Sequence, residues 1–110
     1  MNISILLPYK ENFSKKYPGA VSIFINDINK ISKYKKTTKI YGSTNYKEYL
    51  AKNYINIPFK KNILQSSSKS YIKNFINIIK NKKNDIIEIH NRPSYVKALS
   101  TFFNYSKFVL

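Results

Sequence analysis

The sequence contains no cysteine, which excludes a disulfide framework, a zinc knuckle and a thiol nucleophile. Histidine occurs once, at His90, and the five Asp and Glu residues are not clustered. A metal site needs several such ligands close together, so we expect no metal. Because nothing indicates an oxidising compartment, we expect a cytoplasmic chain.

Glycine is scarce as well, since only Gly19 and Gly42 occur in 110 residues. A nicotinamide-binding turn needs several glycines after the first strand and an acidic residue at the end of the second. Here one glycine precedes the first expected helix, and Gly42-Ser43 stand where the acidic residue should be. This pattern argues against a nicotinamide site.

Long apolar runs are also missing. The run at residues 3–8 is too short for a membrane span or a signal peptide, and no cleavage site follows it. A content of 43% hydrophobic and 15% aromatic residues argues against intrinsic disorder. We therefore expect residues 1–110 to form a single folded domain.

Acidic residues are few, so 20 Lys and Arg against five Asp and Glu give a net charge of +15. Such a charge raises nucleic acid or an anionic membrane surface as a partner. The lysines are spread over every segment, however, and Lys, Asn, Ile and Tyr are the residues that an AT-rich coding sequence supplies. A small basic protein whose ten tyrosines stack on nucleic-acid bases is therefore kept only as an alternative.

Strand-like apolar runs alternate with helical spacings along the chain. We expect strands at residues 2–7, 39–41, 54–57, 86–89 and 108–110, and helices from Gly19 to Lys33, from the serines at 66–68 to Ile79, and over 93–103. In the first helix the apolar residues at helical spacing are Val21, Phe24, Ile25, Ile28 and Ile31. Residues 45–52 form either a short helix or a loop. The alternation predicts a Rossmann-like, three-layer α/β/α fold with a mostly parallel sheet.

The last expected strand has no polar cap, turn or helix after it. We therefore expect an incomplete domain, truncated at its C-terminal strand. An unprotected sheet edge invites aggregation, so a further domain of the same protein or a partner chain should cover it.

The most informative stretch is residues 87–93, where an apolar run stops at His90-Asn91-Arg92 before Pro93 begins a helix. In open parallel sheets, ligands bind outside the carboxyl ends of the strands. Arg92, the sole arginine, offers a planar fork for phosphate or carboxylate, and His90 can bond a hydroxyl or exchange a proton. We expect His90, Asn91 and Arg92 to bind substrate. The alternatives are a structural histidine, an asparagine helix cap and an arginine that caps a carbonyl.

Strand alternation puts Ile86, Glu88 and His90 on one side of the sheet and Ile87 and Ile89 on the other. The Glu88 carboxylate needs a partner such as Lys, Tyr or a backbone N–H, unless it faces a loop and stays wet. We interpret Glu88 as structural support for the corner and not as a catalytic base.

A second polar region precedes the first helix, where the loop 8–18 leads through Lys15 and Lys16 to Gly19 and Ala20. Backbone N–H groups at a helix N-terminus favour phosphate, and a glycine leaves them accessible. We expect Gly19 and Ala20 to bind phosphate, with Lys15 or Lys16 as anion contacts. The alternative is that Gly19 only allows the chain to begin the helix.

Three segments together resemble the N-terminal domain of family 4 glycosyltransferases, which are built from two facing Rossmann-like domains. They are Ile-Ser-Ile-Leu-Leu-Pro at residues 3–8, Pro-Gly-Ala-Val at 18–21 and Ile-Glu-Ile-His-Asn-Arg-Pro at 87–93. The resemblance spans the whole chain, and the strand ending in His-Asn-Arg-Pro is the more distinctive part.

The resemblance implies the acceptor-side half of a retaining, metal-independent transferase that uses a nucleotide-diphosphate sugar and no cofactor. The loop that holds Gly19 would approach the donor diphosphate or the transferred sugar, while His90, Asn91 and Arg92 would line the interdomain cleft. A second domain, absent here, would hold the donor, so this chain alone would be inactive and no catalytic residue is assigned. The acceptor would be a glycan or a lipid-linked glycan, and the basic surface would contact either the inner face of the membrane or a negatively charged acceptor. A third hypothesis is a noncatalytic remnant that docks on a complete transferase.

Overall fold

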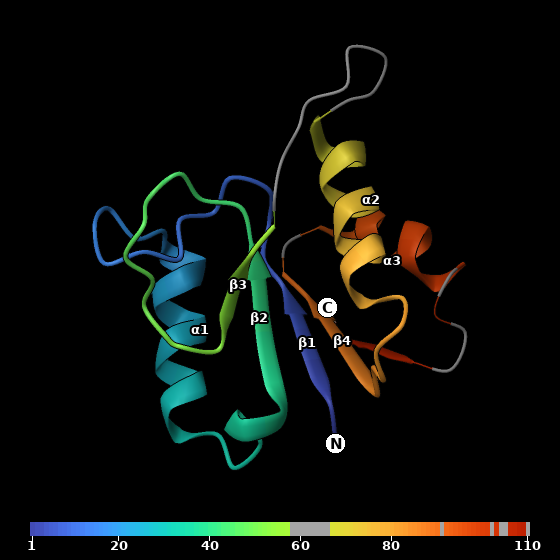
Figure 1. The fold of residues 1–110 in the computed structure, drawn as a ribbon, viewed down its shortest axis with the longest axis horizontal. Helices are drawn as coiled ribbons and strands as arrows, with labels where there is room; N and C mark the ends of the chain where they lie inside the picture. The colour runs from blue at the N-terminus through green and yellow to red at the C-terminus, as the bar shows by residue number, and fades with distance from the viewer. Residues whose placement is uncertain (58–66, 91, 102, 104–105, 110) are drawn as a thin grey trace.

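The structure, a computed structural model, describes residues 1–57, 67–90, 92–101, 103 and 106–109. Its elements in chain order are β1 (Ile3–Leu6), α1 (Ala20–Ile31), the short 3₁₀ helix η1 (Lys35–Thr37), β2 (Thr38–Gly42), β3 (Tyr54–Asn56), α2 (Ser67–Ile79), β4 (Ile86–Ile89), α3 (Pro93–Ser100) and β5 (Lys107–Val109) (Figure 1). Across these residues, no helix has the length and apolar character that crossing a membrane requires.

The five strands form one sheet in the order β3-β2-β1-β4-β5, and every pair is parallel. The chain first moves outward from β1 to β2 and β3, then crosses back to place β4 on the other side of β1. The predicted Rossmann-like α/β fold is confirmed. The point where the strand order reverses lies between β1 and β4, which is where ligands bind in such sheets.

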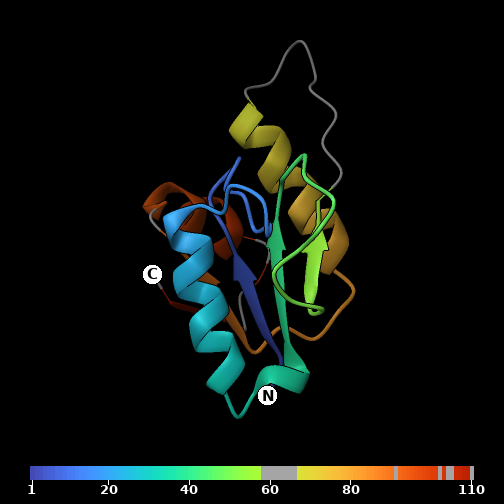
Figure 2. The ribbon, with the colours of Figure 1, turned by 90° about the vertical axis from the view of Figure 1, so that its left-hand side faces the viewer.

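Helices cover both faces of the sheet, with α1 on one side and α2 on the other (Figure 2). The predicted alternation in β4 is confirmed, because Ile87 and Ile89 join the core beneath α2 and α3. Ile86, Glu88 and His90 lie on the opposite face, beside α1.

The core beneath α2 contains buried tyrosines as well as aliphatic side chains. Tyr71 is fully buried, and its hydroxyl donates a hydrogen bond of 2.6 Å to the carbonyl of Leu7, just after β1. Phe75 meets Tyr41 of β2 edge to face, with ring centroids 5.2 Å apart. Because burial disfavours the phenolate, it raises the pKa of Tyr41 and raises that of Tyr71 well above the usual value.

Helix α1 turns a more polar face to the sheet than its apolar spacing suggests. The buried residues are Ser22, Ile25, Asn26 and Asn29, whereas Phe24, Ile28 and Ile31 are exposed. Two polar contacts explain this orientation. Ser22 binds the Glu11 carboxylate, and the side-chain amides of Asn29 and Asn53 donate to each other at 3.0 and 2.9 Å.

The connection between β2 and β3 is a loop, so of the two structures expected for residues 45–52 the loop is the one found. It crosses the loop that follows β1, and the two meet at an antiparallel bridge between Ser14 and Tyr49. Beneath this crossing Phe13 stacks on Tyr54, with ring centroids 4.9 Å apart. The third helix ends at Ser100, earlier than expected, and Ser66 lies outside the described residues.

We expect Tyr71→Phe to lower the free energy of unfolding by about 1–2 kcal/mol at neutral pH, because the buried Leu7 carbonyl loses its donor. Above the ordinary tyrosine pKa of 10.0, the parent chain should lose stability as pH rises. At such pH Tyr71 ionises in the unfolded chain, whereas burial keeps its pKa higher in the folded chain, so ionisation favours unfolding. The Tyr71→Phe variant lacks this ionisation, and its free energy of unfolding should fall less as pH rises. Urea denaturation at neutral and alkaline pH measures both effects.

The control is Tyr17→Phe, since Tyr17 is 69% exposed and should change neither quantity. A Tyr71→Phe chain with the stability and the alkaline sensitivity of its parent would contradict this account of the core.

Candidate functional site

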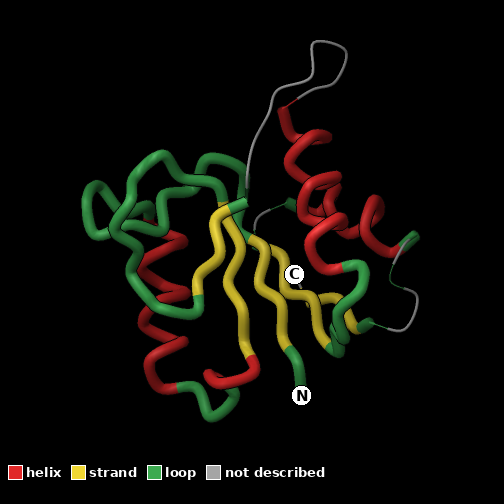
Figure 3. The backbone as a smooth tube through the Cα atoms, viewed as in Figure 1, coloured by secondary structure: helices red, strands yellow, loops and turns green. Residues whose placement is uncertain are grey.

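The long loops lie at the carboxyl edge of the sheet. The strands are parallel, so the segments after β1, β2 and β4 all leave from the same edge (Figure 3). Residues 7–19 follow β1 and residues 43–53 follow β2, and the bridge between Ser14 and Tyr49 holds them together. The predicted site residues of the β1 loop and of the β4 corner therefore come from neighbouring strands at one edge.

The N-terminus of α1 already holds an anionic group. One carboxylate oxygen of Glu11, Oε2, accepts hydrogen bonds from the backbone N–H of Ser22 at 3.0 Å and from its hydroxyl at 2.6 Å. A carboxylate at this position satisfies helix N–H groups that have no partner within the helix and interacts favourably with the helix dipole. Phosphate binding at Gly19 and Ala20 stays a prediction, and such a ligand would have to displace or share the Glu11 contact.

The close approach of Glu11 explains the glycine at position 19. A Cβ built there would lie 1.9 Å from Glu11 Oε2. The backbone of Gly19 is extended, with a φ of −74°, so its conformation does not require glycine. Glycine is required here because any side chain at position 19 would occupy the space of the Glu11 carboxylate.

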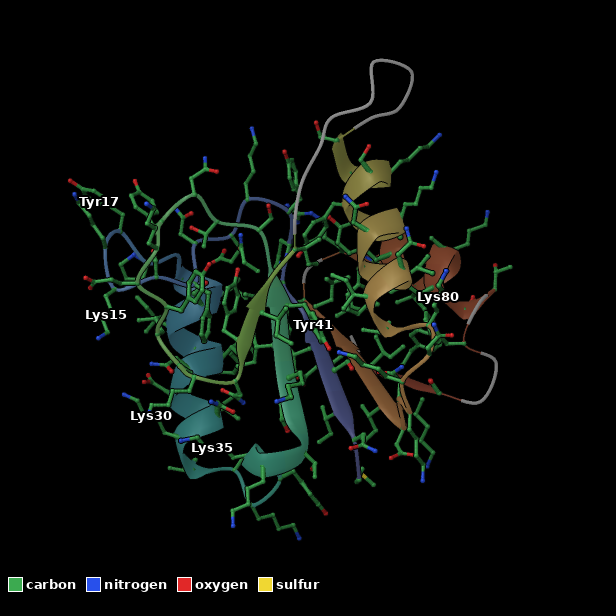
Figure 4. The ribbon with its side chains drawn as sticks, in the orientation of Figure 1. Lys15, Tyr17, Lys30, Lys35, Tyr41 and Lys80 are labelled. Atoms are coloured by element: carbon green, nitrogen blue, oxygen red, sulfur yellow. The ribbon has the colours of Figure 1, made fainter. Side chains whose placement is uncertain are left out.

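Lys15 and Lys16 lie in the loop that leads to α1, and both are exposed. The Lys15 side chain projects outward, away from the sheet (Figure 4). The Lys16 ammonium lies over the ring of Tyr17, 5.9 Å from its centroid. In this arrangement neither lysine joins the Glu11 carboxylate at the start of α1, and their role as anion contacts stays a prediction.

His90 and Glu88 lie side by side on the α1 face of β4. His90 Nε2 is 3.4 Å from Glu88 Oε2, and the side chains are 18% and 31% exposed. Nε2 is buried and makes no hydrogen bond within the described residues. Both side chains line a groove of about 250 Å³ that also includes Phe24 from the first turns of α1. Glu88 thus approaches His90 without a hydrogen bond and stays partly exposed, while no Lys, Tyr or backbone N–H of the described residues bonds its carboxylate.

Arg92 lies at the N-cap of α3 and is exposed. Its carbonyl accepts a hydrogen bond of 3.0 Å from the backbone N–H of Tyr95. This bond closes the first turn of α3, which begins at Pro93. Asn91, the remaining residue predicted at this corner, lies outside the described residues.

A larger polar cleft, which the sequence analysis did not identify, lies at the same edge and has a volume of about 540 Å³. It is lined by residues that follow β1 and β2 and by residues at the end of β3: Tyr9, Lys10, Asn12, Ser43, Thr44, Asn45, Tyr46, Asn56 and Ile57. Most of these side chains are uncharged and can donate or accept hydrogen bonds.

A hydrogen-bond network fixes three of the cleft residues. The Thr44 hydroxyl donates to Asn12 Oδ1 at 2.8 Å, and the Thr44 backbone N–H donates to Asn56 Oδ1 at 2.9 Å. Asn56 Nδ2 donates in return to the Thr44 carbonyl at 3.2 Å. The loops after β1 and β2 and the end of β3 are thereby held in one arrangement, while Ser43 and Asn45 make no such bonds with the described residues.

Lys10 is the only charged residue among the described residues that line the cleft. Its φ of 68° is in the left-handed region, which non-glycine residues adopt infrequently and which is enriched at functional sites. Its ammonium lies 5.6 Å from the centroid of the Tyr9 ring. The cleft thus combines hydroxyl, amide and aromatic groups with one cation, a set suited to a ligand rich in hydroxyl groups.

Gly19→Ala should lower the free energy of unfolding by about 1–2 kcal/mol, the usual value of a lost N-terminal helix cap. The new methyl group would displace the Glu11 carboxylate and break both of its bonds to Ser22. In a Glu11→Ala background the same substitution should cost far less, because no carboxylate is left to displace. Urea denaturation of the four chains measures the coupling. Equal costs in the two backgrounds would show that Gly19 is needed for another reason.

No family model matches the chain, and no curated protein or solved structure matches it either.

Proposed function

We propose that this chain is the acceptor-side half of a retaining, metal-independent glycosyltransferase that uses a nucleotide-diphosphate sugar. The observation that carries the proposal is the polar cleft at the carboxyl edge of a parallel sheet, the edge at which β4 also ends, just before His90 and Arg92. Uncharged amides and hydroxyls recognise sugar hydroxyls, and the tyrosines Tyr9 and Tyr46 offer faces for sugar rings. The sequence motifs at residues 18–21 and 87–93 support the same function.

In this proposal the cleft residues bind and orient the acceptor. Asn12, Thr44 and Asn56 keep the cleft in shape, and Ser43 and Asn45 bond the acceptor directly. Arg92 holds an anionic group of the donor, and His90 bonds a hydroxyl or exchanges a proton. Because water would compete for the same groups, the reaction needs the cleft to be covered.

A second domain or a partner chain would hold the donor nucleotide and cover the cleft. The isolated chain should then bind acceptor without transferring sugar, and transfer should require that second domain or partner chain. A lipid-linked acceptor would bring the chain to the inner face of the membrane in the course of polysaccharide synthesis.

The direct test is binding of neutral oligosaccharides to this chain, measured by saturation-transfer difference NMR and calorimetry. Ser43→Ala and Asn45→Ala should each weaken binding by about fivefold, as expected for loss of one hydrogen bond of about 1 kcal/mol. Neither side chain bonds the described protein, so the fold should be unaffected.

Asn81→Ala is the matched control, because Asn81 is an exposed asparagine that precedes β4 and so lies at the amino edge of the sheet. The proposal fails if no oligosaccharide binds, or if the control weakens binding as much as the cleft variants. Tight, salt-sensitive binding of single-stranded nucleic acid in place of sugar would favour the basic nucleic-acid-binding alternative.

A further inference from the structure

A second polar pocket lies at the opposite edge of the sheet, where β1 and β2 begin, and has a volume of about 250 Å³. Four exposed lysines line it: Lys36 from η1, Lys39 from β2, and Lys82 and Lys83 from the turn after α2. Both η1 and this turn lie at the end of the sheet where the N-terminus is found (Figure 1). Lysines that are spread along the sequence are therefore brought together by the fold.

No carboxylate balances these charges in the part of the chain that the structure describes. None of the described residues that line the pocket is Asp or Glu, and the four ammonium groups make no ion pair with the described residues. Asp85, which follows this turn, uses its carboxylate to accept a hydrogen bond of 2.8 Å from the backbone N–H of Asn2. Because like charges repel, an anion in the pocket would be stabilised by all four lysines.

The segments that carry the lysines are anchored to the sheet. The hydroxyl of Ser4, a buried residue of β1, donates to Asn84 Oδ1 at 2.7 Å. Asn84 Nδ2 donates in turn to the Lys82 carbonyl at 2.9 Å, so the turn with Lys82 and Lys83 is tied to β1. Lys39 pairs in register with Ser4 on the neighbouring strand. Because the backbone is fixed in this way, only the lysine side chains need to become ordered when a ligand binds.

We infer that this pocket, lined by Lys36, Lys39, Lys82 and Lys83, binds a chain of phosphate groups with a free terminal phosphate. The lysine ammonium binds phosphate as a point charge, and four of them around one hollow favour a ligand with concentrated negative charge. A free terminal phosphate carries more charge than the bridged diphosphate of a nucleotide sugar. Inorganic polyphosphate and a nucleoside triphosphate both have this chemistry.

This inference is independent of sugar transfer, because the pocket and the polar cleft share no lining residue and lie at opposite edges of the sheet. The pocket also differs from a surface that attracts any polyanion. Its floor is closed by the buried side chains of Ser4 and Tyr41, so a compact ligand can enter it. A nucleic-acid strand spreads its phosphates along its length and would place few of them in the hollow.

The experiment is isothermal titration calorimetry of this chain with tripolyphosphate, ATP and inorganic phosphate at about 0.1 M salt, where weak long-range attraction is screened. We expect tripolyphosphate and ATP to bind, and inorganic phosphate to bind at least about tenfold more weakly because it reaches fewer lysines. Tighter binding of ATP would identify a nucleotide as the ligand, and equal or tighter binding of tripolyphosphate would identify the inorganic chain.

Lys39→Gln with Lys83→Gln should weaken tripolyphosphate binding by at least about tenfold, the factor expected for loss of one charge-assisted hydrogen bond. Lys73→Gln with Lys97→Gln is the matched control, because it removes the same charge from exposed positions of α2 and α3 that do not line the pocket. Circular dichroism checks that every variant folds.

Absence of binding by both tripolyphosphate and ATP would overturn the inference, and so would an equal effect of the two lysine pairs. A single-stranded oligonucleotide that binds more tightly than tripolyphosphate, and loses its binding in the pocket variant, would overturn it in favour of nucleic acid.

Discussion

The position of β1 is the constraint on which the rest of the structure depends. It pairs in parallel with β2 on one side and with β4 on the other. Parallel pairing on both sides requires every return of the chain to cross a face of the sheet, so helices cover both faces. It also places the ends of β1, β2 and β4 together at one edge, where the polar residues lie.

A second constraint acts within this edge. The Glu11 carboxylate fills the N-terminus of α1, and Gly19 leaves room for it. This contact fixes the loop after β1, from which Asn12 reaches Thr44. The helix-terminal carboxylate and the polar cleft are therefore parts of one loop arrangement. A substitution at the start of α1 should alter the positions of the cleft residues.

The periodicity of the sequence predicts the sheet well and the site only in part. The sheet could be predicted because buried parallel strands are short apolar runs bounded by turn residues, and β4 follows the expected alternation. The orientation of α1 could not, because it depends on polar contacts between Glu11 and Ser22 and between Asn29 and Asn53, which are 11 and 24 residues apart.

The cleft was missed for a similar reason. Asn12, Thr44 and Asn56 belong to three segments that come together only in the fold, although each follows or ends a strand. That position relative to a strand was the available signal, and it was used for His90 and Arg92 but not for these residues. The prediction of phosphate binding at Gly19 and Ala20 depends on the helix N-terminus, the glycine and the nearby lysines, and none of these indicates the Glu11 carboxylate that lies there.

In the proposed function, the residues following β1, β2 and β4 form a single ligand-binding edge. The most direct measurement is backbone NMR of this chain titrated with an oligosaccharide and with a nucleotide sugar. We expect the shifted amide signals to belong to residues 9–12, to residues 43–46 and to His90 and Arg92. Shifts confined to the opposite edge, around residues 35–38 and 81–85, would contradict the account.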